Sequence, residues 1–448
     1  MEQLRRTNTI LLDPTLMQER QLREYAEASA RLWNIANYQR RQALFKGSGL
    51  PDYSSQCKAL KATMPFKALG TCKAQALLAK LNEAWGSYLA LKRLERRRKL
   101  ACHIKKVEPP RYLKDRRRKT LIAESIYVRK DGYRQIGQML VLSKKLRIAF
   151  KAGDLWVGEQ GRLELHYDQL RRRWYGRIPV KVKWSHKGRP HHLTPKRASI
   201  DLGICNLATC VVERSLIALV YSGRAVLSDW RYWTKRIASE QQRLAKVNGK
   251  RASTRLKAMF RRRTRRLHHA IDAMLRDLFE RLEADDLTEL VVGDLKHIRI
   301  NARDHGRVGN QKLHNFWVFQ EIRQRIVELG EEYGIKARFK SERDSSKRCS
   351  VCGQTHASGR IHRGLYRCME TGQMLNADVN GALNILYGGK VAALSGSGPM
   401  ARPMLLRWDG REWNHSNGMP IHRRNAAETR ISALLSRRVP KEGIYMGL

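Results

Sequence analysis

The chain has 448 residues, and its 89 Lys and Arg against 41 Asp and Glu give a formal net charge of +48. Such an excess opposes compaction unless a polyanion neutralises it, and nucleic acid fits because each neutralised phosphate releases a counterion. Neither an apolar run of transmembrane length nor a signal peptide is apparent, so the sequence argues against a membrane or exported protein.

The N-terminal part combines strand patterns with amphipathic helices. Residues 8–14 predict a strand, apolar residues at helical spacing follow to about residue 36, and a second helical pattern covers 70–100. Pro109-Pro110 ends this region. Short alternating runs then predict strands at 138–143, 146–151, 163–167 and 174–184. This order predicts a small β-barrel with helices inserted after its first strand.

The C-terminal part predicts an α/β domain. We expect three strands within residues 196–225, a helical hairpin over 228–284, and then a strand, a helix and a strand at 290–295, 316–333 and 335–341. A strand meander followed by helices and by strands that end in acids is typical of an RNase H-like fold. Residues beyond about 390 have little periodic pattern, so we expect a flexible basic extension.

Four acids in this part of the chain are candidate metal ligands. Asp201 and Asp294 lie at the ends of apolar strand patterns, Glu342 follows the last one, and Asp378 precedes an apolar helical run. An acid there is costly unless a positive group meets it. RNase H-like folds bring such carboxylates together around two Mg²⁺ ions about 4 Å apart, and Mg²⁺ prefers oxygen ligands. The alternative for Asp378 is a helix N-cap.

A cysteine cluster predicts a second metal site. Cys349-x-x-Cys352 and Cys368-x-x-Thr371 have the spacing of a zinc ribbon in which Thr371 takes the fourth ligand position. His356 or His362 could complete a Cys₃His site for Zn²⁺; the alternative is a ribbon without zinc.

The motifs around these residues resemble those of TnpB proteins, which are RNA-guided nucleases of bacterial and archaeal transposons and ancestral to compact type V CRISPR effectors. The resemblance rests on Ile200-Asp201-Leu202-Gly203, Val292-Gly293-Asp294-Leu295, Cys349-Ser350-Val351-Cys352 and Asn376-Ala377-Asp378-Val379-Asn380, in this order. It covers about residues 5–390. It implies a protein that binds a structured guide RNA, reads a short duplex motif beside the target DNA, and cuts that DNA with Mg²⁺.

The same resemblance implies a multidomain α+β architecture. A wedge β-barrel (1–15 and 109–195) would hold an inserted helical recognition domain (16–108). A RuvC nuclease (196–342, with its third motif at 374–390) would be interrupted by a zinc-ribbon-like insert for target nucleic acid (343–373), before a basic tail (391–448). We expect guide RNA and target DNA as partners, no membrane, a monomer, and a cytoplasmic, nucleoid-associated protein of a prokaryote.

One departure from the family pattern affects the third metal ligand. The second RuvC motif usually carries Glu directly before Asp-Leu, and here Gly293 stands in that place. Asp294 remains, but alternation along a strand turns it to the other face. Some family members supply the acid from the neighbouring strand, and Glu342 fits that position. We therefore favour Glu342 over Asp294, and a site without a third acid is the remaining possibility.

Three functions stay open on the sequence. The first is an active RNA-guided DNA endonuclease. Gly293 and the incomplete ribbon motivate a second, a guide-dependent DNA binder that blocks its target or regulates transcription. The third is an RNA-binding protein that acts through charge alone, which leaves the spaced acids unexplained. The sequence does not distinguish a transposon-encoded protein from a CRISPR-associated one.

Overall fold

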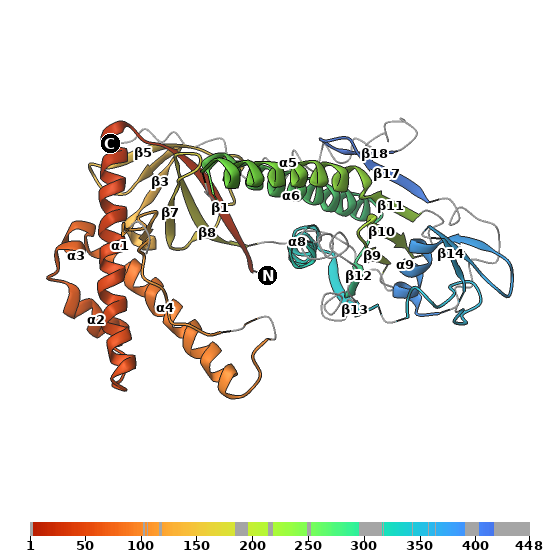
Figure 1. Cartoon of the computed structure of the whole chain (residues 1–448), viewed down its shortest axis with the longest axis horizontal. Coiled ribbons are helices and arrows are strands. Elements are labelled where there is room, and N and C mark those ends of the chain that lie inside the picture. Colours follow the sequence, from red (N-terminus) through yellow and green to blue (C-terminus); the bar gives the residue numbers. More distant parts are fainter. Residues whose placement is uncertain are drawn as a thin grey trace. The chain divides into compact units, whose positions relative to one another are not determined.

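The computed structural model describes residues 3–101, 104, 106–115, 119–183, 196–213, 218–248, 252–294, 316, 318–342, 344–356, 358–362, 364–389 and 403–415. The described residues form two compact units, one from the residues up to 183 and one from residue 196 onward, and each is described by itself (Figure 1). Within the described residues, no helix combines the length and the apolarity needed to cross a membrane.

An eight-stranded sheet forms the centre of the first unit. β1 (Gln3–Asp13) pairs antiparallel with β8 (Arg173–Lys183) and, at its C-terminal end, with β5 (Arg147–Lys151). The other strands are β2 (Ser125–Val128), β3 (Arg134–Ile136), β4 (Met139–Val141), β6 (Glu159–Gln160) and β7 (Leu163–Asp168). Their order is β2-β7-β8-β1-β5-β4-β3, with β6 beside β8. The N-terminal strand and the later strands therefore share one sheet, although no ladder among the described residues closes it into a ring.

Four helices lie between β1 and β2: α1 (Leu16–Phe45), α2 (Tyr53–Leu60), α3 (Met64–Leu69) and α4 (Thr71–Arg96). Thr15 begins α1 with a capping box that includes Gln18. The helices bury a core of their own, in which Trp85 of α4 donates from Nε1 to Asn37 Oδ1 of α1 at 2.9 Å. The sequence predicts α1 and α4; it misses α2 and α3 because six or eight residues are too few for a clear period.

The second unit contains a seven-stranded mixed sheet. β9 (Arg197–Leu202), β10 (Asn206–Val212) and β11 (Ala218–Ser222) form an antiparallel meander. β12 (Glu289–Asp294) runs parallel to β9 on its other side, and β13 (Lys336–Ser341) runs parallel to β12. The C-terminal ends of these three parallel strands therefore lie at one edge of the sheet. Each of these strands was predicted from the sequence.

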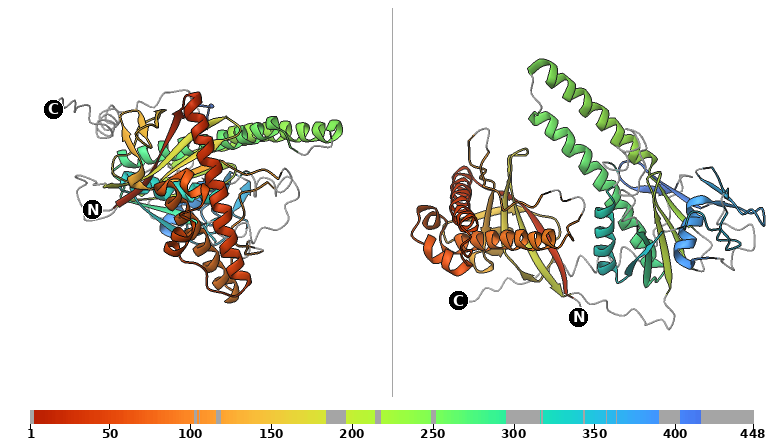
Figure 2. Two further views of the ribbon diagram at one scale, coloured as in Figure 1. Left: turned by 90° about the vertical axis from the view of Figure 1, so that its left-hand side faces the viewer. Right: turned by 60° about the horizontal axis from the view of Figure 1, so that its bottom comes forward.

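Helices cover both faces of this sheet. α5 (Arg224–Asn248) and α6 (Thr254–Ala284) form an antiparallel hairpin, drawn in green in Figure 2. α6 and α8 (Phe319–Tyr333) pack on the face that carries Ile200, while α9 (Ala377–Tyr387) packs on the opposite face against Val211.

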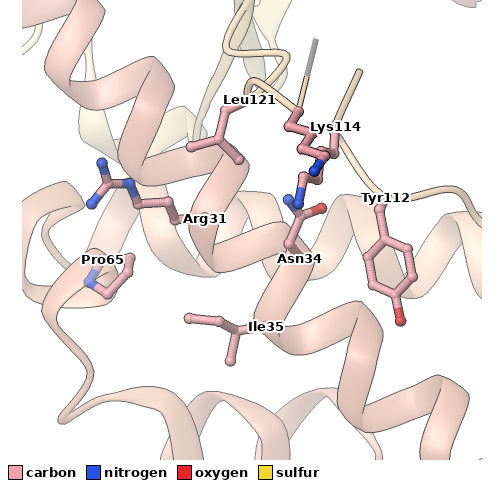
Figure 3. Close-up of a pocket in the computed structure, with 8 residues that line it drawn as sticks. Arg31, Asn34, Ile35, Pro65, Tyr112, Lys114 and Leu121 are labelled. Carbon is pink, nitrogen blue, oxygen red and sulfur yellow. The ribbon is translucent and has the colours of Figure 1, made fainter. Parts of the chain in front are cut away.

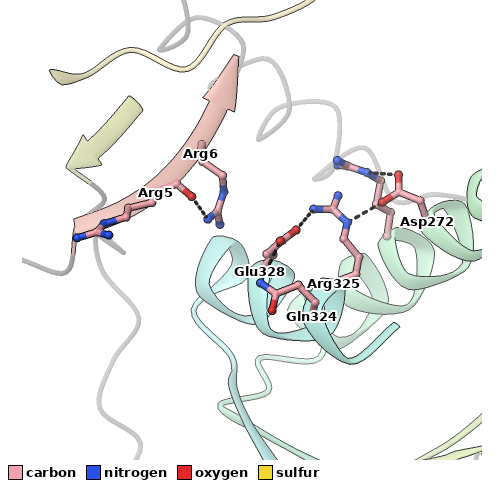
Figure 4. Close-up of polar contacts among 7 residues, drawn as sticks. Arg5, Arg6, Asp272, Gln324, Arg325 and Glu328 are labelled. Atoms are coloured by element: carbon pink, nitrogen blue, oxygen red, sulfur yellow. Dashed lines mark hydrogen bonds and ion pairs between the residues drawn. The ribbon is translucent and has the colours of Figure 1, made fainter. Parts of the chain in front are cut away.

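Charged pairs and a small separate core complete the helical layer. Arg325 of α8 pairs with Asp272 of α6 at 2.6 Å and with Glu328 at 3.2 Å (Figure 4). The half of the hairpin around its turn has a small apolar core of its own, formed by Ile237, Leu244 and Leu256. This cluster is separate from the main core of the unit.

A small antiparallel sheet follows β13 and precedes α9. Its strands are β14 (Arg360–His362), β15 (Leu365–Arg367) and β16 (Met374–Asn376). Asn376 is both the last residue of β16 and the N-cap of α9. The position of Asp378 therefore depends directly on the end of this insert.

The expectation of a patternless tail from residue 391 is wrong for part of that segment. β17 (Met404–Trp408) pairs parallel with β11, and β18 (Trp413–His415) pairs with β17. Both strands are too short to give a periodic signal, yet Trp413 is 5% exposed and donates from Nε1 to Ala270 O of α6 at 3.0 Å. These residues complete the edge of the sheet.

We predict that Trp413→Ala lowers the free energy of unfolding of the second unit by about 3 kcal/mol, because it removes a buried ring and its hydrogen bond. Val247→Ala, at a side chain that is 65% exposed, is the control and should change it by less than about 0.5 kcal/mol. Urea denaturation followed by amide hydrogen exchange in β11 and α6 measures both. Equal effects of the two substitutions would contradict the assignment of this strand to the sheet.

Candidate active site and metal centre

Asp201 lies on β9 and faces helix α9. Its neighbours Ile200 and Leu202 belong to the core on the other face, so alternation along the strand turns the carboxylate toward α9. A Cβ atom added to Gly381 would lie 2.6 Å from Asp201 Oδ2, closer than real carbon atoms approach. Glycine at position 381 therefore lets the helix backbone lie against the carboxylate.

Glu342 directly follows β13 and occupies the space beside Gly293. A Cβ atom added to Gly293 would overlap the Glu342 carboxyl group. The two strands are neighbours in register, with Gly293 opposite Lys340. The family pattern usually has Glu at the position of Gly293 on β12. Glu342, from the end of the adjacent strand β13, places its carboxyl group beside that position. Oε1 of Glu342 is buried and accepts no hydrogen bond from any residue that the structure describes.

Asp378 is the second residue of α9, and both its oxygens are engaged. Asn206 donates from Nδ2 to Oδ2 at 2.6 Å, and Arg360 of β14 donates to Oδ1 at 3.1 Å. The N-cap of the helix is Asn376, whose side chain accepts from the backbone N–H groups of Asp378 and Val379. The N-cap interpretation of Asp378 is therefore wrong, and its carboxylate instead accepts hydrogen bonds from Asn206 and Arg360.

The electrostatics of Asp201 and Glu342 indicate a site that a positive charge would stabilise. Burial raises the pKa of Asp201 well above its usual range, and the carboxylates of Glu342 and Asp378 raise it further, while Arg360 lowers it. Burial, followed by the charge of Asp294, raises the pKa of Glu342 to about 7. Enclosed carboxylates that repel one another are costly without a positive partner. Their oxygens, one of them unpartnered, fit Mg²⁺.

Asp294 has a different environment from the other three acids. It ends β12 and forms an ion pair with Arg323 of α8 at 2.9 Å. The Arg323 guanidinium also lies 3.8 Å from the centre of the Phe339 ring. The structure thus places Glu342 and Asp378 within electrostatic range of Asp201 and gives Asp294 a pairing role between β12 and α8.

Two polar residues of this region were missed by the sequence analysis. Asn206 follows the Asp201 motif by five positions, so its place at the start of the antiparallel neighbour of β9 could have identified it. Arg360 is one of 89 basic residues, and no local pattern distinguishes it.

The second centre consists of Cys349, Cys352, His356 and Cys368. Their Sγ and imidazole nitrogen atoms all lie within 4.8 Å of one another. His356 Nε2 is 3.1 Å from Cys352 Sγ and 4.0 Å from Cys368 Sγ. Among the described residues, this is the one group of three or more His, Cys, Asp or Glu side chains close enough together to share a metal ion without rearrangement. Three thiols and one imidazole are a donor set for tetrahedral Zn²⁺.

The structure also decides between the two histidines proposed as fourth ligand. His362 lies on β14 with an exposed side chain and is not part of the cluster. Thr371 has neither a thiol nor an imidazole to offer, and its backbone N–H donates to Cys368 Sγ at 3.5 Å. None of the cysteines outside the cluster that the structure describes forms a disulfide.

The first unit has a separate groove of about 500 Å³ (Figure 3). It is lined by Arg31, Asn34, Ile35, Pro65, Tyr112, Lys114, Lys119 and Leu121. No acid lines it, so it has no metal-ligating character.

Comparison with known proteins gives the family. Residues 177–299 match a family model described as a probable transposase, and residues 319–385 match the model of the Cas12f1-like TNB domain. A TnpB-like protein of Acidianus two-tailed virus is 33% identical over 409 residues, which cover 85% of this chain and 86% of that protein. The chain belongs to the TnpB family. The resemblance drawn from the sequence motifs is confirmed.

Two further proteins are similar to this TnpB-family chain. The CRISPR-associated endodeoxyribonuclease Cas12f1 of Sulfoacidibacillus thermotolerans is 36% identical over 85 residues, or 19% of each chain. The solved structure of a mini-RNA-guided endonuclease, CRISPR-Cas phi3, aligns with a TM-score of 0.49 at 11% identity, over 86% of this chain and 92% of that one.

We predict that the purified protein holds about one Zn²⁺ per chain and that His356→Ala weakens zinc affinity by at least about tenfold, because it removes one of the four donors. Competition with a chromophoric chelator measures the affinity. His362→Ala is the matched control and should leave it unchanged. If His362→Ala weakens zinc binding and His356→Ala does not, the fourth ligand is misassigned.

Proposed function

We propose that this TnpB-family protein is a Mg²⁺-dependent, RNA-guided DNA endonuclease and that Asp201, Glu342 and Asp378 hold its metal ions. The single observation that carries the proposal is that Glu342, after β13, and Asp378, on α9, both act electrostatically on the buried Asp201 of β9, while a buried Glu342 oxygen has no hydrogen-bond partner among the described residues. In a chain with a net charge of +48, acids that repel one another at one site are best explained by a metal ion.

The strand order supports an RNase H-like, RuvC-type nuclease domain. The order β13-β12-β9-β10-β11 combines an antiparallel meander with two strands parallel to β9. We further propose the domain division set out from the sequence: wedge (1–15 and 109–195), recognition domain (16–108), nuclease (196–342 and 374–390) and zinc-ribbon insert (343–373).

Each residue of the site would have a defined task. Bound Mg²⁺ supplies Lewis-acid chemistry that activates water and stabilises a leaving oxygen. Asp201 and Glu342 present carboxylate oxygens from a rigid sheet edge, and Asn206 fixes the orientation of Asp378 by its hydrogen bond to Oδ2. Arg360 brings a guanidinium to the same carboxylate, and a guanidinium can pair with a phosphate group of the substrate.

The α5–α6 hairpin supports nucleic acid as the partner. Residues 230–271 contain 14 Lys or Arg and a single acid, Glu240. Like charges this dense destabilise isolated helices, whereas phosphate groups would neutralise them. Arg236 and Arg262 lie 5.5 and 4.8 Å from the centre of the Trp233 ring, and such stacking holds guanidinium groups in place. By family, we propose guide RNA and target DNA as the bound partners.

The atypical second motif is the specific observation that favours a guide-dependent binder without cleavage. The position of Glu342 over Gly293 argues against that alternative, because it returns a carboxylate to the place where the motif lacks one.

Asp201→Ala should abolish DNA cleavage while guide RNA binding is retained, because the buried carboxylate lies at the proposed metal site and contributes no positive charge for binding RNA. Loss of a metal ligand removes several kcal/mol of transition-state stabilisation, so the rate should fall by about a thousandfold or more. The measurement is Mg²⁺-dependent cleavage of a matching target by protein purified with its own RNA. Cleavage that survives in Asp201→Ala refutes the catalytic assignment, and a wild-type protein that binds its target without cutting it establishes the alternative.

Glu342→Gln and Asp294→Asn separate the two candidates for the third ligand. We expect Glu342→Gln to lower cleavage by about a thousandfold and Asp294→Asn by less than about tenfold, because Asp294 already pairs with Arg323. The double variant Gly293→Glu, Glu342→Gly moves the acid back to β12 and should cleave faster than Glu342→Gln. Gly293→Glu alone should lower cleavage, because its side chain would collide with that of Glu342. The reverse ranking of the single variants would assign the ligand to Asp294.

A further inference from the structure

Two buried asparagines on α9 have no role in the carboxylate site described above. Asn380 is completely buried and Asn384 is 4% exposed. Both side chains bind residues 345–350, the loop that leads into the cysteine cluster. Buried amides are retained where their hydrogen bonds fix a geometry, so these contacts indicate what α9 must hold in place.

Asn380 bonds with both its oxygen and its nitrogen. Oδ1 accepts from the backbone N–H of Ser350 at 2.9 Å and from the Ser350 hydroxyl at 2.8 Å. Nδ2 donates to Arg348 O at 2.9 Å. Ser350 is itself completely buried and follows the thiol ligand Cys349 directly. The side chain therefore fixes the backbone on both sides of Cys349.

Asn384 adds a second attachment one helical turn further on. Its Nδ2 donates to Ser345 O at 2.8 Å and to Arg348 O at 2.7 Å. Ser345 in turn donates from its backbone N–H to Glu342 O at 3.0 Å. The loop held by the two asparagines thus begins at the acid Glu342 and ends at the cysteine cluster.

The other side of α9 is tied to the carboxylates. Asp378 lies two residues before Asn380, and Gly381 lies against Asp201. Ala382 O accepts from the buried Ser199 hydroxyl of β9 at 2.6 Å. One short helix therefore contacts two of the acids on one side and the knuckle of the cysteine cluster on the other.

We propose that Asn380 and Asn384 are positioning residues that couple metal loading of the Cys₃His cluster to cation binding by Asp201, Glu342 and Asp378. A cation held by the cluster would fix Cys349 and therefore its neighbours Arg348 and Ser350. Because Asn380 and Asn384 bind these neighbours, the orientation of α9 and of the loop that begins at Glu342 would be fixed as well. The proposal rests on the proposed function of the three acids. Because such coupling is reciprocal, each site should tighten the other by the same factor.

The experiment measures Mn²⁺ affinity in the full-length protein without added nucleic acid, by electron paramagnetic resonance of free Mn²⁺. Each variant is measured with its cysteine cluster loaded with Zn²⁺ and again after the zinc is removed with a thiol-selective chelator. We expect zinc loading to tighten Mn²⁺ binding by about tenfold in the wild type. In the double variant Asn380→Ala, Asn384→Ala, the ratio of the Mn²⁺ affinity with zinc to the Mn²⁺ affinity without zinc should fall close to one.

Two controls make the result specific. Asn37→Ala removes an equally buried asparagine of the first unit, which bonds to Trp85 and Pro110, and should leave the wild-type ratio intact. Asp201→Ala should abolish tight Mn²⁺ binding whatever the zinc content. The absorption spectrum of the Co²⁺-loaded cluster confirms that each variant still loads its thiols.

If removal of zinc unfolds the second unit, a measurement on the loaded protein replaces the ratio: Asn380→Ala with Co²⁺ in the cluster should bind Mn²⁺ more weakly than wild type and show a shifted Co²⁺ spectrum.

A wild-type ratio of one, or a ratio unchanged in the asparagine variant, overturns the coupling while the carboxylate assignment stands. In the protein with Co²⁺ in its cluster, an Asn380→Ala variant that binds Mn²⁺ as tightly as the wild type also overturns the coupling. Tight Mn²⁺ binding that survives in Asp201→Ala overturns the carboxylate assignment, and the coupling with it.

Discussion

The parallel pairing of β9, β12 and β13 is the constraint on which the candidate site depends. Because all three strands run in the same direction, their C-terminal ends meet at one edge of the sheet, and residues about 140 positions apart become neighbours there. The buried apolar faces of these strands fix their register, since a slip of one residue would turn the core residues outward. Apolar packing of the strands thus keeps the acids close together, although the net positive charge of the chain opposes a compact fold.

In the proposed site, Glu342 fills the space that Gly293 leaves, so the chemistry could be kept while the sequence pattern changes. What a metal ion meets is a carboxylate in a volume of space, and that volume lies between two adjacent strands. Either strand can supply the side chain provided that the other leaves room, and glycine leaves the most. Gly293 in the second motif and Glu342 after β13 are therefore expected to change together, because an acid at one position requires a small residue at the other.

The sequence predicted much of this architecture, for identifiable reasons. Long amphipathic helices such as α6 and apolar strands such as β12 carry strong periodic patterns, and Asp201 and Asp378 sit in recognisable motifs. β17 and β18 escaped prediction because their strand character comes from pairing with β11 and from one buried tryptophan, Trp413. The choice of His356 over His362 needed three dimensions, since both follow Cys352 at plausible spacings. Arg360 carries no signal in a chain so rich in arginine.

The hairpin of α5 and α6 has one more consequence. Its outer half packs around Ile237, Leu244 and Leu256 and shares none of these with the main core. Helical turns can therefore be added or removed there in matched pairs, at no expense to the sheet that carries the acids. The length of the hairpin can therefore change without altering the sheet edge that carries the acids.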